Sequence, residues 1–297
     1  MNFIPTMAAD IARLLAELRP KLHRYCARMV GSAIDGEDVV QDALLKAIQS
    51  FAAAGPIGNL EGWLFRIAHN TALDFLRRRN RQEGIRSGEE VDMMADPADT
   101  VESRQAAAAS LRTFMRLPVA QRGSVILMDV LGCSLQEICE VMDFSLPAAK
   151  AALHRGRTRL SELAGEPDDA PSPMLSQAER TRLSAYVDHF NARDFDAIRD
   201  MIAGDVRLDL VNKTRLNGKA EVSRYFGNYS KVHDWHLAPG TVEGHPAVVV
   251  FDPGERSSQP KYFMLLQWDG DKIAAIRDFR HASYVADGIE FLVAPAA

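Results

Sequence analysis

Cysteine is scarce in this sequence, since its 297 residues include only Cys26, Cys133 and Cys139. Their odd number and the lack of a CxxC pair indicate neither a disulfide framework nor a zinc site, so we expect buried thiols. Apolar runs are also short, because none reaches the ~18 residues of a membrane-spanning helix. The start, MNFIPTMAADIARLL, lacks the basic-then-apolar order of a signal peptide. We therefore expect a cytoplasmic protein with no membrane insertion.

Net charge is small as well, at −5 for the whole chain. Residues 1 to 165 hold 20 basic and 20 acidic side chains, whereas residues 166 to 297 hold 15 basic and 20 acidic ones. A polyanionic partner must therefore meet local basic patches and not a positive field of the whole protein. The hydrophobic content of 47% excludes a disordered or fibrous chain and predicts several packed cores.

Two breaks in composition divide the chain. Residues 83 to 102 hold seven acids and one base with two glycines and a proline, and the stretch GEPDDAPSP (165 to 173) contains three prolines. Such compositions are typical of linkers. Helical periodicity covers the segments before and between them. We predict domains over 1–82, 105–164 and 175–297, joined by linkers over 83–104 and 165–174.

The last predicted domain differs from the first two in mixing helical and β-strand patterns. Helices are predicted at 176–192 and 219–229, and β-strands at 206–212, 232–239, 247–252, 261–269 and 272–280. The WDGDK turn favours a hairpin between the last two strands, because Asp-Gly suits the left-handed positions of a tight turn. This pattern predicts an α+β domain with an antiparallel sheet.

A helix over 61–81 has two contrasting faces. Its buried stripe is predicted at Leu64, Ile67, Ala68, Thr71, Ala72 and Phe75. Another face combines an amide with cations, which suits a phosphate backbone with some base-edge contact. The candidate DNA-binding residues are Trp63, Arg66, Asn70, Arg77, Arg78, Arg79 and Arg81. The alternative is an ordinary helix C-terminus whose cations stabilise the negative end of the helix dipole. Trp63 would then pack in the core and not stack on an unpaired base.

A second basic element follows the signature of a helix-turn-helix. Ser134 and Glu137 form a capping box for the first helix, and Ser145 before Pro147 starts the second. Leu135, Ile138 and Cys139 are predicted to pack on Ala149, Ala152 and Leu153. The second helix has no acid between 144 and 161, which suits a recognition helix in a major groove. Its candidate DNA-binding residues are Ser145, Lys150, His154, Arg155, Arg157 and Arg159.

The alternative for this element is a helical hairpin with a solvated cationic face. Two basic elements on a flexible tether nevertheless suit two DNA boxes a fixed distance apart.

These motifs resemble the extracytoplasmic-function (ECF) class of bacterial sigma factors. DGEDVVQDALLKAIQSF (35–51) is similar to region 2.2, WLFRIAHNTALDFLRRRNR (63–81) to regions 2.3 and 2.4, and LPVAQRGSVILMDVLGCSLQEICEVMDFSLPAAKAALHRGRTRL (117–160) to region 4. The resemblance implies all-α regions 2 and 4 that read the −10 and −35 promoter elements. It also implies contacts with the β′ clamp helices and β flap of core RNA polymerase.

The acidic start of the 35–45 helix agrees with the clamp contact. Asp35, Glu37, Asp38, Gln41 and Asp42 suit either a basic partner or the positive end of their own helix.

Two departures from the family leave the promoter sequence open, because AAAGPIG (52–58) is glycine-rich and SLPAAKAAL (145–153) has alanines where Thr and Ser are frequent.

The last domain resembles the SnoaL-like, cone-shaped α+β fold in its element order and its IRDFR strand. Such folds enclose a pocket, for which we consider Asp209, His236 and Asp278, with His233 and His281 as further acid-base candidates. No nucleophile motif, metal-spaced cluster or phosphate loop accompanies them, so we expect no enzyme and no cofactor. The resemblance implies a fused regulator that contacts regions 2 and 4.

Two hypotheses follow. The first is a sigma factor that lends promoter recognition to core RNA polymerase and is modulated by its last domain. The second is a DNA-binding repressor coupled to a SnoaL-like sensor or enzyme. Only the first needs the acidic helix at 35–45.

Overall fold

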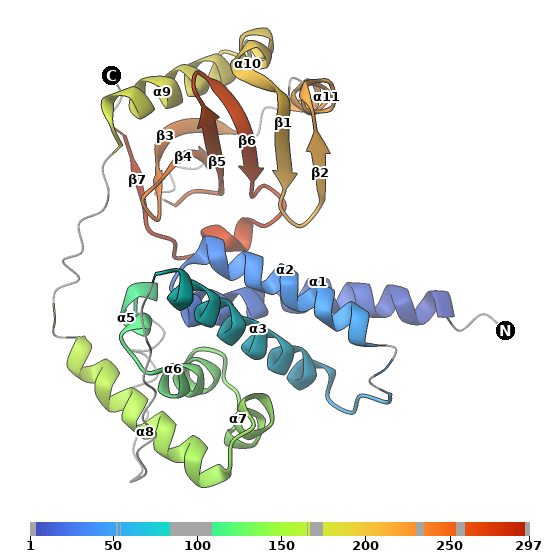
Figure 1. Cartoon of the computed structure of the whole chain (residues 1–297), viewed down its shortest axis with the longest axis vertical. Coiled ribbons are helices and arrows are strands. Elements are labelled where there is room, and N and C mark those ends of the chain that lie inside the picture. Colours follow the sequence, from blue (N-terminus) through green and yellow to red (C-terminus); the bar gives the residue numbers. More distant parts are fainter. Residues whose placement is uncertain are drawn as a thin grey trace. The chain divides into compact units, whose positions relative to one another are not determined.

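The computed structural model describes residues 4–51, 53, 55–83, 109–164, 166, 175–229, 235–253 and 259–294 (Figure 1). The chain divides into two compact units, Met1–Asp169 and Ala170–Ala297. Apart from Glu83 and Glu166, the two predicted linkers lie outside the described residues. Within the described ranges, no helix is long and apolar enough to cross a membrane.

The first unit is entirely helical in its described part. The helices predicted up to residue 82 are confirmed, and the segment after 108 folds into shorter helices that lead to the helix-turn-helix. In chain order the elements are α1 (Ile4–Val30), α2 (Ala33–Phe51), α3 (Leu60–Gln82), α5 (Leu111–Met115), α6 (Val119–Val125), the π-helical turn η1 (Ile126–Val130), α7 (Leu135–Met142) and α8 (Leu146–Leu163).

Helices α1 and α2 approach each other closely at Gly36. A Cβ atom at this position would lie 2.6 Å from the Cα atom of Ala27, a distance that real Cβ contacts do not show. Glycine is therefore required for this crossing. Helix α3 packs against both α1 and α2, with Leu64, Ala68 and Ala72 in the shared core.

The helices after residue 108 pack on the first three and extend the same hydrophobic core. Arg122 of α6 joins the two groups, because its guanidinium donates to the carbonyl oxygens of Met29 at 2.6 Å, Leu117 at 2.9 Å and Met115 at 3.3 Å. Its side chain is buried. The two predicted helical domains therefore form one compact unit in this structure.

The helix-turn-helix has the predicted caps. Ser134 and Glu137 make both bonds of the capping box, and the Ser145 hydroxyl accepts from the backbone N–H of Ala148. Ile138 is buried in the same hydrophobic core as Ala149 and Leu153 of α8. Between the helices, Asp143 adopts a left-handed conformation at φ 57°, which closes α7 and turns the chain sharply.

The second unit has the predicted α+β class, with a single sheet in the order β2-β1-β6-β5-β4-β3-β7. Its pairs are antiparallel except β1 with β6, which is parallel, so the sheet is mixed and not purely antiparallel. Its elements are α9 (Gln177–Asn191), α10 (Phe195–Met201), β1 (Ile202–Leu210), β2 (Thr214–Asn217), α11 (Lys219–Tyr229), β3 (His236–Val242), β4 (His245–Phe251), β5 (Tyr262–Asp269), β6 (Lys272–Asp278), the 3₁₀ turn η2 (Ser283–Ala286) and β7 (Phe291–Val293).

Helices cover one face of this sheet. Helix α9 packs on β3 and β4, and α11 packs on β1 (Figure 1). They enclose a core rich in aromatic side chains. Phe190 is central, with ring centroids 4.9 Å from Trp235 and 5.2 Å from Tyr229. The predicted hairpin between β5 and β6 is confirmed, with Gly270 at φ +56° in its turn.

Candidate nucleic-acid interface

Helix α3 has one solvent-exposed face and one buried face, as predicted. Arg66, Asn70, Arg77 and Arg81 are exposed, while the opposite stripe is buried or half-buried. Asn70 also borders a groove of about 440 Å³ between α2 and α3, whose other lining residues are Lys46, Gln49, Ser50, Ile67 and Thr71. The exposed face therefore combines cations, an amide and a polar groove, which is suited to a nucleic-acid backbone.

The arginines at the end of α3 have different roles. Arg79 is half-buried, donates to the carbonyl oxygen of Val30 at 2.9 Å and stacks on the Phe75 ring at 5.8 Å. It fastens the end of α3 to the end of α1, and its assignment as a DNA contact stays a prediction. Arg77 pairs with Asp74 of its own helix at 3.0 Å, and Arg78 lies 3.9 Å from Asp42 of α2.

Trp63 lies at the start of α3, and the sequence left open whether its ring stacks on an unpaired base or packs in the core. The structure places it half-buried against the core, with its ring edge-on to Phe51 at 6.2 Å.

Helix α8 exposes only part of its predicted basic face. Lys150 is exposed and follows Leu146, whose apolar side chain is 46% exposed at the start of the helix. Arg157, by contrast, is bidentate to the buried carboxylate of Asp129 in η1, with Nε to Oδ2 at 2.9 Å. It locks α8 onto the preceding turn, and its assignment as a phosphate contact stays a prediction. Arg159 pairs with Glu162 at 2.8 Å.

The acidic and amide residues predicted at the start of α2 differ in exposure. Glu37 is 0% exposed and accepts from the Nε atom of Arg19 at 3.0 Å, so it is an internal ion pair and not a surface for polymerase. Asp35, Asp38 and Gln41 are half-buried and Asp42 is exposed.

Two exposed apolar residues follow on α2, Leu45 at 51% and Ile48 at 60%. Gln41, Asp42, Leu45 and Ile48 recur at helical spacing and form what we call the α2 strip. Sequence reasoning missed its apolar half, although two apolar residues off the buried stripe of an amphipathic helix were a usable signal.

The core of the first unit holds a buried histidine. This residue is His69, whose Nδ1 atom lies 2.6 Å from the hydroxyl oxygen of Tyr25. Burial lowers the pKa of His69 to about 4. It is therefore neutral at pH 7 and serves packing and not DNA contact.

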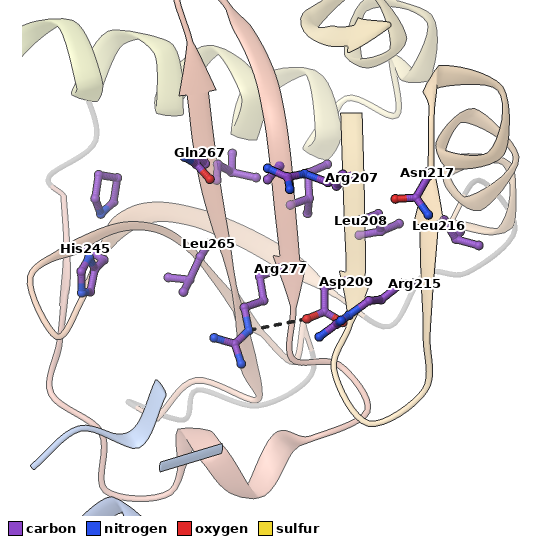
Figure 2. A pocket seen from close by; sticks show the side chains of 14 residues that line it. Arg207, Leu208, Asp209, Arg215, Leu216, Asn217, His245, Leu265, Gln267 and Arg277 are labelled. Carbon is purple, nitrogen blue, oxygen red and sulfur yellow. Dashed lines mark hydrogen bonds and ion pairs between the residues drawn. The ribbon is translucent and has the colours of Figure 1, made fainter. Parts of the chain in front are cut away.

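The predicted pocket residues of the second unit do not converge. Asp209 lies in a pocket of about 500 Å³ on the sheet, where Arg215 and Arg277 point toward it at 3.4 and 3.9 Å (Figure 2). His236 is exposed at the start of β3 and lines neither this pocket nor the one described below. His233 lies outside the described residues.

Asp278 is completely buried at the end of β6. Its Oδ2 atom accepts from the hydroxyls of Tyr225 and Tyr229, the latter at 3.0 Å, and Oδ1 accepts from the backbone N–H of Arg280 at 2.8 Å. Burial raises the pKa of Asp278, and these hydrogen bonds oppose that rise. Within the described residues, no three His, Cys, Asp or Glu side chains are arranged to hold a metal ion.

Comparison with known proteins identifies the helical unit. Residues 14–82 match the family model of sigma-70 region 2, and residues 111–160 match that of sigma-70 region 4. The chain is 30% identical over 212 residues to the ECF RNA polymerase sigma factor SigG of Mycobacterium tuberculosis, covering 63% of this chain and 57% of SigG. It is 32% identical over 145 residues to the ECF sigma factor SigM of the same organism, covering 49% of this chain and 72% of SigM.

The chain belongs to the ECF sigma factor family. Regions 2 and 4 of this sigma factor comprise α1 to α3 and α5 to α8. The chain spans 57% of the length of SigG. A solved structure, that of the ECF sigma factor SigJ of M. tuberculosis, is similar over 90% of this chain and 95% of SigJ, at 18% identity and a TM-score of 0.36.

Proposed function

We propose that this ECF sigma factor binds core RNA polymerase and directs it to specific promoters. The observation that carries the proposal is the pairing, in one chain, of an exposed cationic and amide face on α3 with a helix-turn-helix whose second helix exposes Lys150. Because core polymerase is the partner, the chain would act in the cytoplasm.

Region 2 would read the −10 element through α3. Arg66 and Asn70 are exposed side by side on the face away from the core, where an arginine fork suits phosphate and an amide can both donate and accept at a base edge. Arg77, Arg78 and Arg81 would add phosphate contacts further along the helix. Trp63 would support α3 from the core side.

Region 4 would read the −35 element as duplex DNA. The start of α8 presents Leu146 and Lys150 to solvent, in the part of a recognition helix that meets base edges. His154, Arg155 and Arg159 would then lie along the phosphates. Arg157 would act indirectly, since its pair with Asp129 fixes the direction of α8.

The α2 strip is the proposed docking surface for the β′ clamp helices. An exposed carboxylate at Asp42 beside Leu45 and Ile48 suits a partner helix with both basic and apolar side chains. Region 4 would meet the β flap. The C-terminal unit would modulate initiation by contacting regions 2 and 4, because a tethered domain acts at an effective concentration near millimolar.

Run-off transcription with purified core polymerase tests the proposal. The full chain is compared with a fragment ending at Asp169, the boundary of the first compact unit, on promoters selected from a genomic library. We expect transcripts from a defined promoter set, and the ratio of the two proteins gives the sign of the C-terminal effect. If neither protein starts transcripts, the proposal fails and a sensor-coupled repressor replaces it.

A charge-reversal variant separates polymerase binding from DNA binding. Asp38→Arg with Asp42→Arg should abolish pull-down of core polymerase and leave binding to promoter duplex unchanged. The matched control is Asp205→Arg with Asp271→Arg, which makes the same charge change on exposed positions of the second unit. Transcription that survives the first variant would rule out α2 as the docking helix.

A further inference from the structure

A pocket of about 620 Å³ lies at one end of the sheet in the second unit. It is formed where the turn between β1 and β2, helix α11 and the residues after β6 meet. Its volume lies within the range of small-molecule sites, and its walls include the apolar side chains of Leu210 and Leu216.

Two tyrosines line this pocket in front of a buried carboxyl group. The hydroxyls of Tyr225 and Tyr229 both lie within hydrogen-bonding distance of Oδ2 of Asp278, and the Tyr225 hydroxyl also lies 2.8 Å from the Tyr229 oxygen, to which it can donate instead. Because the Tyr225 proton is used inside this network, its oxygen keeps lone-pair capacity to accept a further hydrogen bond. It is therefore placed to accept a hydrogen bond from a ligand hydroxyl.

Cations surround the same pocket. Lys213, Arg224 and Arg280 line it. The lining carboxylate of Glu221 lies 4.0 Å from Arg224 and also accepts from the backbone N–H of Asn217 at 3.0 Å. Arg280 lies over the Tyr229 ring at 5.0 Å and so extends the charge toward the phenols. The surplus of positive charge favours an anionic ligand.

We propose that this pocket binds a small hydroxylated aromatic carboxylate. Its carboxylate would pair with Lys213 and Arg224, its ring would lie against Leu216 and the tyrosine rings, and its hydroxyl would donate to the Tyr225 oxygen. This site adjoins the pocket of Figure 2, which lies beside Asp209 on the sheet, and the two share Leu216 as a lining residue. The proposal does not depend on the role of the chain in transcription.

Calorimetric titration of the full chain tests the proposal with three probes: 4-hydroxybenzoate, 3-hydroxybenzoate and 4-hydroxyphenylacetate. We expect saturable binding of at least one, about tenfold weaker affinity for the analogue lacking the carboxylate, and a similar loss in Lys213→Glu with Arg224→Glu. Arg207→Glu, in the pocket of Figure 2, is the matched control and should bind as the wild type does.

Tyr225→Phe distinguishes a ligand contact from a purely structural role of the tyrosine network. The wild type should bind whichever hydroxybenzoate it prefers more tightly than it binds benzoate. In Tyr225→Phe this preference should disappear, while the affinity for benzoate stays the same. Thermal unfolding confirms that each variant is folded. The proposal is overturned if no probe binds at millimolar concentration, if Arg207→Glu and not the Lys213 variant loses binding, or if Tyr225→Phe keeps the full preference.

Discussion

Replacing Glu37 by glutamine should destabilise the first unit strongly and should not act through polymerase contact. The carboxylate is 0% exposed, and its Oε1 atom accepts from two nitrogen atoms of Arg19, one of them Nε at 3.0 Å. The guanidinium is itself only 9% exposed. The variant therefore removes the negative charge of Glu37 from this buried ion pair.

Breaking a buried ion pair by removing one partner costs about 3–5 kcal/mol. For a unit of typical stability this is a large share of the total free energy of unfolding. With a typical urea dependence of about 2 kcal/mol per molar, the midpoint should fall by roughly 2 M. Urea titration of the fragment ending at Asp169, followed by circular dichroism, measures it.

The double variant Arg19→Met with Glu37→Met provides the matched control. It removes both charges and keeps similar volume, so it should recover most of the lost stability, because apolar replacement of a buried pair is often neutral. The reasoning is refuted if Glu37→Gln unfolds with the wild-type midpoint but loses affinity for core polymerase, since Glu37 would then act at the surface.

Three further predictions concern buried polar groups. Asp129→Asn should lower the free energy of unfolding by about 2 kcal/mol, because the bidentate bond to Arg157 loses its anion; thermal unfolding measures it, and an unchanged melting temperature would contradict it. The first unit should lose stability as pH falls from 6.5 to about 4, by up to ~1.4 kcal/mol per pH unit, since His69 is buried neutral in the folded state and protonates readily in the unfolded one. His69→Gln should remove that component of a pH-dependent urea series; an unaltered slope would contradict it. Tyr186→Phe should leave stability within ~0.5 kcal/mol or raise it, because the buried Tyr186 hydroxyl has no hydrogen-bond partner in the described structure; a clear loss in calorimetry would reveal a hidden acceptor.

Long elements were predictable from sequence and short ones were not. The helices now named α2, α3, α9 and α11 and the β5–β6 hairpin lie close to their predicted bounds, because each spans enough residues for its periodicity to appear. The missed elements, α10, β2 and β7, have seven, four and three residues. The parallel pairing of β1 with β6 was also missed, because it joins strands far apart in sequence.

The candidate DNA-binding and docking surfaces were predicted in outline but not residue by residue. Composition marked α3, α8 and the start of α2 correctly as charged helices. It assigned Glu37, Arg79 and Arg157 to their surfaces, whereas these side chains are engaged by partners 18, 49 and 28 positions away in the chain. Conversely, the exposure of Leu45 and Ile48 was missed, although their place off the buried stripe of α2 was a usable signal.

The sequence by itself determined what depends on neighbours along the chain. Ser134 and Glu137 cap α7 because they lie three residues apart, and the family motifs of regions 2 and 4 depend on residue order alone. The tertiary structure alone decided which charged groups remain at the surface and which are buried against a partner. Asp278 illustrates this, because only folding brings Tyr225 and Tyr229 of α11 to a carboxyl group about fifty residues away and creates the pocket in front of them. The physical reason is that burying a charge demands a partner, and chain topology determines which distant side chain arrives there.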